Sequence, residues 1–328
     1  MSKSNPAARK SGGYRIGIDT GGTFTDVVVG DASGILSVGK ALTTRERISR
    51  GILEGLGVAA APLGLDAGAL LGQTAVFIYG STRATNAILE GKIARTALLV
   101  THGFPDILVR REGGKTNPWD YGADYPEPYI PRHLTFEIIE RMSAEGQVLT
   151  PFDLTGARTV MQRLRAQRVE AVAVCLLWSI ANPAHELALG RLIEQELPGI
   201  PYTLSHQVNP IVREYRRASS AAIDASLKPL MQQHLREMEA DLRAAGLAGE
   251  LLPAISLGGV MHIDGVIDRP TNRCIDRTFD GYVDRALPLG CDAHLFAQVR
   301  AALLGCLSLW FLRLLRLDGN PSLLTEVG

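Results

Sequence analysis

Asp19-Thr20-Gly21-Gly22-Thr23-Phe24-Thr25-Asp26 is the stretch on which the predicted fold depends. Apolar runs at 14–18 and 27–29 flank it, which predicts a β-hairpin with a tight Gly-Gly turn. Glycines let backbone amides approach a ligand, and amides beside threonine hydroxyls form a concavity that suits phosphate oxygens. A carboxylate ending the first strand can hold Mg²⁺ through water. The alternative is an ordinary Gly-Gly turn with solvated polar neighbours.

A second candidate anion site lies further along the chain. The apolar strand 76–79 runs into Gly80-Ser81-Thr82, and a helix is expected from there to about Leu89. A strand, a Gly-Ser-Thr turn and a helix N-terminus together can bind an anion. An ordinary βα turn with a capping serine is the alternative.

The order of the predicted elements indicates the fold class. Two hairpin strands and a third strand at 35–42 precede a helix, a strand, a helix and a strand at 96–101. The helix after the third strand is expected to begin with a capping box, Thr43-Thr44-Arg45-Glu46, and to end near Gly57. This order is similar to the ribonuclease-H-like half-domain of actin, sugar kinases and Hsp70-type ATPases, an analogy at the level of fold. We therefore expect an α/β protein with such a half-domain plus an additional α/β segment.

Composition excludes several classes of protein. The 328 residues carry 34 Lys+Arg and 34 Asp+Glu, so the zero net charge argues against a broad nucleic-acid surface. The basic, polar start has no apolar core of a secretory signal, and the apolar stretch 303–317 is interrupted by Arg313 and Arg316. Four cysteines have no metal-type spacing. We expect a reduced, cytoplasmic chain with neither nucleic-acid nor membrane partners.

The middle of the chain predicts a second α/β segment. Residues 170–178 are nearly all apolar, typical of a parallel strand buried on both faces, with Cys175 as a core thiol. Residues 102–135 predict a long irregular loop, either functional or a surface wrap. A long helix is expected over 210–246, broken or kinked at Pro229, with the charged run 213–217 on a solvated face.

These motifs together resemble the N-terminal part of the hydantoinase A / 5-oxoprolinase / acetone carboxylase β-subunit family. The resemblance covers about residues 14–270. The strings that carry it are Ile16-Gly17-Ile18 with the hairpin stretch, GSTRATNAILE at 80–90, THGFPDIL at 101–108, Leu149-Thr150-Pro151, AVAVC at 171–175, Asn182-Pro183-Ala184-His185-Glu186, and Arg213-Glu214-Tyr215 with Arg217-Ala218-Ser219. A valine is usual in the family where this chain has Arg83.

The resemblance implies ATP-dependent chemistry on a cyclic amide, in which ATP phosphorylates the substrate oxygen and a hydantoinase B-type partner subunit completes the reaction. It implies that Asp19 positions Mg²⁺, that Asp26 positions a water or the loop, and that ATP phosphates contact the two loops. The residues implied in nucleotide binding are Thr20, Gly21, Gly22, Thr23, Phe24, Thr25, Gly80, Ser81, Thr82 and Asn86.

Two departures concern the second half of the nucleotide cleft. Family members read Ser-Asn-Gly-Gly where this chain reads Ser256-Leu257-Gly258-Gly259, and residues 271–328 match no part of the family. We expect a disordered leader at 1–13, a hydantoinase/oxoprolinase N-terminal domain at 14–205, the start of the hydantoinase A core domain at 206–270, and an atypical tail at 271–328. A frameshift or truncation is the hypothesis for this tail, with impaired ATP binding as its consequence.

Three other functions remain open. The first is the β-type subunit of an ATP-dependent acetone or acetophenone carboxylase, acting on a ketone. The second is a non-catalytic fragment or assembly module. The third is a sugar kinase, which the hairpin suits but the strings after residue 80 do not.

Overall fold

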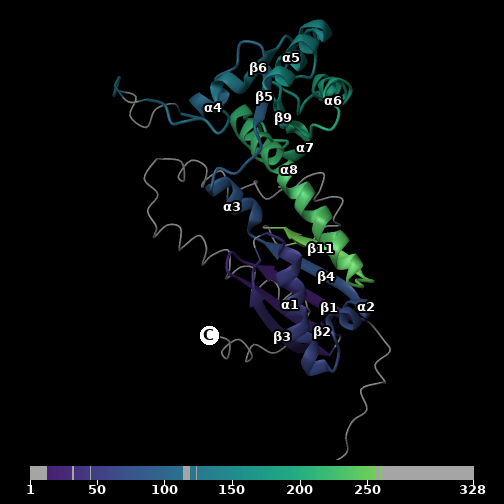
Figure 1. Cartoon of the computed structure of the whole chain (residues 1–328). Helices are drawn as coiled ribbons and strands as arrows, with labels where there is room; N and C mark the ends of the chain where they lie inside the picture. The colour runs from purple at the N-terminus through teal and green to yellow at the C-terminus, as the bar shows by residue number, and fades with distance from the viewer. Residues whose placement is uncertain are drawn as a thin grey trace, which may run out of the picture. The chain divides into compact units, whose positions relative to one another are not determined.

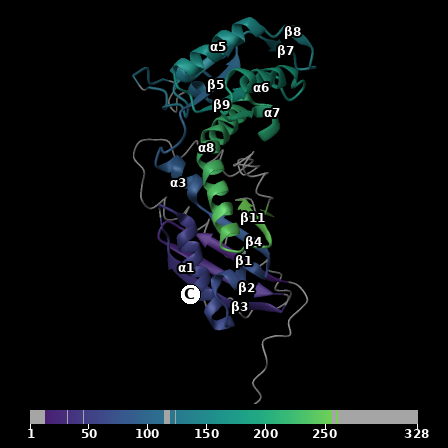
Figure 2. The ribbon, with the colours of Figure 1, turned by 45° about the vertical axis from the view of Figure 1, so that its right-hand side comes forward.

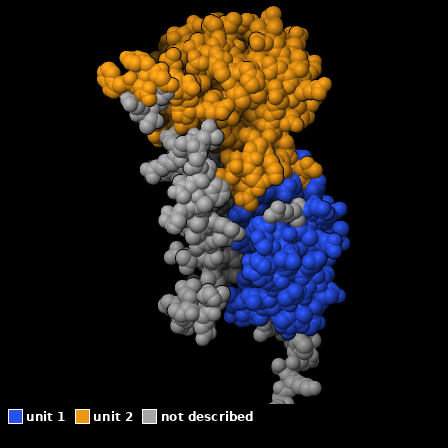
Figure 3. Space-filling view, turned by 60° about the vertical axis from the view of Figure 1, so that its left-hand side comes forward, with its two compact units in different colours: residues 1–83, 234–264, 292–328 blue, residues 84–233, 265–291 orange. Residues whose placement is uncertain are grey.

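The computed structural model of the chain describes residues 13–31, 33–44, 46–113, 119–122, 124–255 and 259–260 (Figure 1). Two compact units divide them: residues 13–83 and 234–260 belong to unit 1, and residues 84–233 to unit 2 (Figure 3). Residues 1–12 of the leader predicted at 1–13, the tail at 271–328 and the stretch 256–258 lie outside the described residues. Within the described ranges, no helix has the length and apolar character needed to cross a bilayer.

Unit 1 is built on one mixed sheet whose strands lie in the order β12-β11-β4-β1-β2-β3 (Figure 2). The first three strands form an antiparallel meander, whereas β4 and β11 run parallel to β1. The elements are β1 (Tyr14–Thr20), β2 (Phe24–Asp31), β3 (Gly34–Leu42), α1 (Ile48–Ala60), η1 (Ala61–Leu63), α2 (Ala67–Gly72), β4 (Thr74–Ser81), β11 (Glu250–Ile255) and β12 (Gly259–Val260). The predicted hairpin and third strand are confirmed.

One face of this sheet is closed by α1. Ile18 of β1 pairs with Val27 of β2, both are buried, and a Cβ atom on Gly55 of α1 would meet the Val27 side chain at 2.9 Å. On β3, a Cβ atom on Gly39 would lie 2.3 Å from the Gly55 carbonyl oxygen. Glycine at both positions therefore lets helix and strand approach closely. On the opposite face, Val38 stays 64% exposed.

Unit 2 contains a fully parallel sheet in the order β10-β9-β5-β6. Its elements are β5 (Thr96–Thr101), α4 (Ile107–Arg110), η2 (Arg132–Leu134), β6 (Thr135–Ile138), β7 (Arg141–Met142), β8 (Val148–Thr150), α5 (Leu154–Ala166), β9 (Ala171–Cys175), α6 (Ala184–Glu196), β10 (Tyr202–Leu204) and α7 (Ser205–Val208). Helix α3 (Arg83–Leu89) begins at the last residue of unit 1, and α8 (Glu214–Ala244) has residues in both units.

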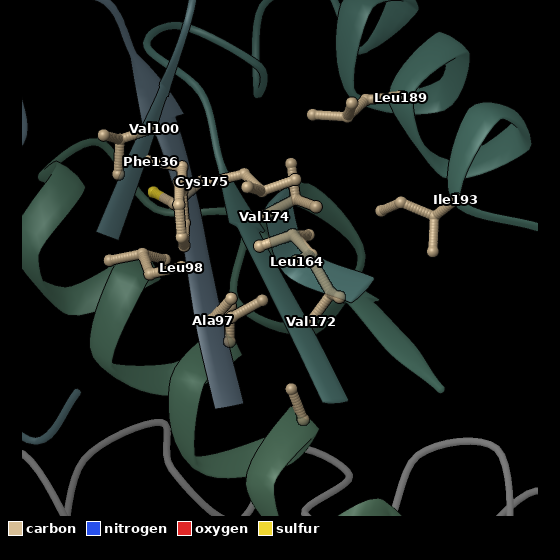
Figure 4. Packing of buried hydrophobic residues seen from close by; sticks show 14 of the residues in the cluster. Ala97, Leu98, Val100, Phe136, Leu164, Val172, Val174, Cys175, Leu189 and Ile193 are labelled. Carbon is tan, nitrogen blue, oxygen red and sulfur yellow. The ribbon is translucent and has the colours of Figure 1, made fainter. Parts of the chain in front are cut away.

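The core of unit 2 confirms the buried-strand prediction for residues near Cys175. Every residue of β9 is buried, and so is every residue of β5. Figure 4 shows the sulfur of Cys175 among the apolar side chains of this cluster, which include Val100 and Phe136. Burial raises the pKa of the Cys175 thiol to about 12, so this cysteine is an unreactive core residue.

The predicted start of α1 is wrong. The helix begins at Ile48, not within the Thr43–Glu46 box, and its N-cap Arg47 makes no side-chain cap bond. The Thr44 hydroxyl donates to the Arg47 carbonyl at 2.9 Å and accepts the Gly51 N–H at 2.8 Å. The Thr44 hydroxyl therefore accepts from the amide of Gly51, in the first turn of the helix. This contact accompanies a helix start at Ile48 instead of within the predicted box. The helix ends at Ala60, three residues beyond the predicted end.

Helix α8 differs from its prediction at two points. It begins at Glu214, because Arg213 before it has a φ of 101°, which no helix accommodates. It also continues through Pro229, so the predicted break is absent, and the alternative of a kink at Pro229 stays a prediction. The Ala94 N–H donates at 3.1 Å to the Ser226 carbonyl, three residues before the proline. That outside donor supplies a partner where the proline disturbs the helix ladder.

The solvated face predicted for the charged run is wrong for Arg217. This side chain is fully buried and donates to the carbonyls of Leu176 at 2.7 Å and Ile211 at 3.1 Å. Nearby, the fully buried Glu186 accepts the Leu176 N–H at 2.9 Å and the Ser205 hydroxyl at 2.7 Å. Both charges satisfy loop groups after β9 and β10, so they hold the carboxyl edge of the sheet together.

Candidate functional site

The two loops predicted to bind phosphate lie side by side at one edge of the unit 1 sheet. Asp19 at the end of β1 pairs with Asp26 of β2 on one side and with Gly80 of β4 on the other. Thr20 likewise lies between Thr25 and Ser81. Because β1 and β4 are parallel, both strands deliver their loops to the same edge. The predicted residues 19–26 and 80–82 are thus brought together.

The Gly-Gly turn is open to solvent at its tip. Gly21 N–H donates to the Phe24 carbonyl at 3.0 Å, which closes the turn and occupies this amide. Gly22 and Thr23 are exposed, and no atom lies within 4 Å of a Cβ placed on Gly22. The amides at 22 and 23, rather than the one at 21, are therefore positioned to meet a ligand.

Asp19 has an unusual environment for a carboxylate. Its Oδ1 atom is buried without a hydrogen-bond partner in the described part of the chain. Burial, and then the charge of the facing Asp26, raise the pKa of Asp19. A Cβ placed on Gly80 would lie 3.7 Å from this Oδ1, so the glycine leaves space beside the carboxylate. An unpaired buried acceptor of this kind is suited to a cation or to an ordered water.

The negative charge of Asp26, unlike that of Asp19, is paired with a cation. Its side chain is 51% exposed and accepts from Lys40 Nζ of β3 at 2.8 Å. The same ammonium lies 4.9 Å from the centre of the Phe24 ring, a cation–π contact. Lys40 was absent from the predicted site; its position directly opposite Asp26 depends on the β2–β3 register, which the hairpin motif did not supply.

The hydroxyl groups of the two loops differ in their hydrogen-bond partners. Thr25 is fully buried, and its hydroxyl bonds the Thr43 hydroxyl at 2.9 Å within the unit. Thr20 is buried as well, but its Oγ1 has no partner among the described residues. Ser81 Oγ accepts the Arg83 N–H at 3.1 Å. Thr20 and Ser81 thus stand nearer to a ligand-binding role than Thr25 does.

Two other residues of the predicted site, Thr82 and Asn86, have less direct support from the structure. Thr82 is half-buried in unit 1 beside Ser81. Asn86 is exposed on α3 and belongs to unit 2. Helix α3 has only seven residues, so its N-terminus supplies little dipole to a bound anion. The roles of both residues in ligand binding stay predictions.

Behind β4, α8 contributes a buried polar pair that the sequence did not indicate. The Tyr79 hydroxyl lies 2.9 Å from His234 Nε2. Burial, followed by the charge of Arg83, lowers the pKa of His234 to about 4, and burial raises the pKa of Tyr79 to about 12. Both groups are therefore neutral at physiological pH. They fix α8 against β4, close to the second loop.

The donor set fits Mg²⁺ held mainly by water. Among the described residues, no three His, Cys, Asp or Glu side chains cluster as a protein-made metal cage. Mg²⁺ commonly uses one or two carboxylates, waters and substrate phosphates instead. Asp19, with its unpaired oxygen, is the residue that would hold the ion, and the ion would neutralise charge on a nucleotide phosphate.

Comparison with known proteins places the chain in a family. Residues 15–197 match the hydantoinase/oxoprolinase N-terminal region. The chain is 34% identical to caprolactamase subunit alpha of Pseudomonas jessenii, over 69% of this chain and 33% of that protein. It is 32% identical to the acetophenone carboxylase gamma subunit of Aromatoleum aromaticum, over 74% of this chain and 35% of that protein.

The fold has a counterpart among solved structures. The crystal structure of the ATP-dependent caprolactamase from Pseudomonas jessenii superimposes with a TM-score of 0.68 and 33% identity, over 75% of this chain and 36% of that chain. The mixed α/β fold is therefore shared with this enzyme, and the chain spans about a third of the length of the relatives named above. The match to the N-terminal region and the identity to these subunits agree: the chain belongs to the hydantoinase/oxoprolinase family.

Proposed function

We propose that this chain carries one half of the nucleotide site of an ATP-dependent enzyme that hydrolyses a cyclic amide. The observation that carries the proposal is the pairing of Asp19 with Gly80 and of Thr20 with Ser81, which joins the two predicted phosphate loops. The 34% identity to a caprolactamase subunit supports a cyclic-amide substrate. The ATP-dependent caprolactamase that shares the fold supports ATP.

We propose that unit 1 is a ribonuclease-H-like half-domain. Its strand order, with an antiparallel meander β3-β2-β1 followed by parallel β4 and β11, supports this assignment. In such half-domains the first hairpin turn contacts nucleotide phosphates, which is the position of Gly21–Thr23 here. The boundaries 14–205 and 206–270 remain predictions for the wider domain organisation.

The proposed reaction transfers the terminal phosphoryl group of ATP to the amide oxygen of the substrate in its imidate form. The bond between the β,γ-bridging oxygen and the γ-phosphorus breaks, a bond from the amide oxygen to that phosphorus forms, and ADP leaves. Water then adds to the activated carbon, and the ring C–N bond opens, with a proton passing to the leaving nitrogen, to give an acyl phosphate. A second water hydrolyses the acyl phosphate to the carboxylate and inorganic phosphate. Asp19 would position the metal, and the amides at 22 and 23 with the hydroxyls of Thr20 and Ser81 would orient the phosphates.

A second function has its own support. The 32% identity to an acetophenone carboxylase subunit, at coverage similar to that of the caprolactamase match, favours a carboxylase subunit that activates a ketone enolate. Both functions use the same phosphoryl transfer to oxygen. Both also require a partner subunit, as the word subunit in the names of these relatives suggests. A cytoplasmic location stays a prediction.

An ATPase assay of the full chain tests the proposal. Phosphate release is measured with Mg²⁺ over a panel of lactams, hydantoins and ketones, with and without bicarbonate and a hydantoinase B-type subunit. Stimulation by lactams or hydantoins without bicarbonate supports the amide hydrolase. Stimulation by ketones with bicarbonate supports the carboxylase. No nucleotide binding and no turnover under any of these conditions would leave the non-catalytic fragment as the correct description.

A further inference from the structure

Unpartnered polar atoms gather around the second loop of the candidate site. In the described part of the chain, six buried side-chain polar atoms have no hydrogen-bond partner, and three of them belong to Asp19, Thr20 and Arg83. Thr20 pairs with Ser81, and Ser81 Oγ accepts the Arg83 N–H, so the three residues lie around one strand pair. Buried atoms without a partner in a native fold call for an explanation, such as a bound ligand.

Arg83 is the cation of this group. Its Nε atom is buried, and its guanidinium has no carboxylate partner among the described residues. Two other arginines of unit 1 are paired: Arg47 donates to Asp241 at 2.5 Å, and Arg50 lies 3.3 Å from Glu54. Arg83 Nε therefore retains a donor that no group of the described residues accepts.

Several carboxylates line the same hollow as Arg83, and Arg83 forms no ion pair with them in the described part of the chain. It lines a hollow of about 30 Å³, and the other charged or titratable groups there are Glu46, Arg47, His234, Glu237 and Asp241. A hollow of this size holds about one water molecule. Asp241 is engaged by Arg47 and by the Ser49 hydroxyl. Arg83, Glu46 and Glu237 all line this hollow, but no ion pair joins Arg83 to either carboxylate among the described residues.

We infer that Arg83 is an oxyanion-binding residue of the candidate site, one that recognises either a nucleotide phosphate or a carboxylate on the substrate. The inference rests on the proposed function for the identity of the anion. A guanidinium presents its donors as a planar fork that matches phosphate and carboxylate oxygens. Arg83 directly follows Ser81-Thr82, and its backbone N–H donates to Ser81 Oγ, which joins Arg83 to the loop that pairs with Thr20 and is predicted to contact phosphate.

The test compares the full-length wild type with Arg83→Met and Arg83→Lys. Met keeps the length of the side chain without charge, and Lys keeps the charge without the fork. Arg50→Met is the matched control, because it removes the same charge from an exposed arginine of the same unit. Calorimetry measures the affinity for the magnesium complex of a non-hydrolysable ATP analogue. NMR titrations measure inorganic phosphate, neutral caprolactam and 5-oxoproline, a lactam that carries a carboxylate.

Loss of a charged hydrogen bond predicts weaker anion binding by roughly 10- to 100-fold in Arg83→Met, an intermediate loss in Arg83→Lys, and no change in Arg50→Met. If the affinity falls for the nucleotide and for inorganic phosphate, Arg83 binds the nucleotide phosphate. If the affinity falls for 5-oxoproline alone, Arg83 binds the substrate carboxylate. Caprolactam binding should be unchanged in either case.

Thermal unfolding without ligand separates this role from a structural one. Arg83 is half-buried and forms no ion pair with a carboxylate of the described residues, so Arg83→Met should melt at or above the wild-type temperature. A melting temperature several degrees lower, or equal anion affinity in all four proteins, overturns the inference. The proposed function fails separately: if the wild type binds no nucleotide but binds phosphate through Arg83, the inference stands and the ATP-dependent reaction does not.

Discussion

Replacing Asp19 by Asn should stabilise the ligand-free protein while it abolishes its affinity for Mg-nucleotide. The Asp19 carboxylate is partly buried, its Oδ1 has no partner among the residues that the structure describes, and Asp26 faces it directly across the strand pair. Like charges directly opposite each other in a sheet destabilise by about 0.2–1 kcal/mol, and an unsatisfied buried acceptor costs about 1–3 kcal/mol. Asn removes the repulsion and can donate to Asp26, so we expect a gain of about 1 kcal/mol.

Calorimetric unfolding measures this gain as a rise in melting temperature of about 2–4 °C. Nucleotide titration of the same sample should show a loss of Mg²⁺-dependent affinity of at least about tenfold. Asp26→Asn is the control. Asp26 is exposed and already paired with Lys40, so the lost ion pair and the relieved repulsion should nearly cancel. A lower melting temperature for Asp19→Asn, or unchanged Mg²⁺-dependent binding, would refute the reasoning.

The pH dependence provides a second readout for the same residue. The pKa of Asp19 in the folded protein is raised above its ordinary value of 3.8, so folding takes up a proton between these two values. The destabilisation is therefore complete above the raised pKa and is relieved as the pH falls toward 3.8. The Asn variant should lack this component of the stability profile. An identical profile in wild type and variant would contradict the assignment.

Three further predictions concern stability. Folding lowers the pKa of His234 from 6.5 to about 4, so its contribution to stability should be complete above pH 6.5 and be lost as the pH falls toward 4. In urea unfolding, His234→Gln should reduce the dependence of the unfolding free energy on pH over this range. Arg217→Met should cost at least about 2 kcal/mol in the same assay, because two buried carbonyls lose their donor; a neutral outcome would contradict this. Gly39→Ala should cost about 1–3 kcal/mol by overpacking against α1, whereas Gly57→Ala, with open space around its Cβ, should stabilise; equal effects would count against the close helix–strand contact.

Much of the fold was accessible from local sequence patterns. The apolar runs on either side of the Gly-Gly turn predicted the hairpin, and the apolar run near Cys175 predicted a parallel strand buried on both faces. The mixed α/β class could be predicted from such patterns because each of them spans only a few neighbouring residues of the chain. Helix starts were less accessible. Thr43 matches the N-cap of a capping box in sequence, but its hydroxyl bonds Thr25, and it is the Thr44 hydroxyl that accepts from the Gly51 N–H. These partners depend on how the chain enters the helix.

The candidate site shows the same division between local and long-range information. The sequence by itself determined the types of residue, namely glycines, hydroxyls and an aspartate in two short loops, because turn chemistry is local. Only the tertiary structure decided that Asp19 lies beside Gly80, that Lys40 neutralises Asp26, and that Thr25 is committed to Thr43. Those relations depend on strand register, which couples residues far apart in the chain and is fixed by burial of one sheet face.

The charged residues make this point most clearly. Arg217 belongs to a charged run predicted to be solvated, yet it lies fully buried with carbonyl partners. Arg83 follows the second predicted loop, and its buried Nε has no partner among the described residues. Sequence specifies that a guanidinium is present, but its free energy depends on which donors and acceptors the fold places around it. That placement is a property of the packed units, and it separates an arginine that stabilises the fold from one available to a ligand.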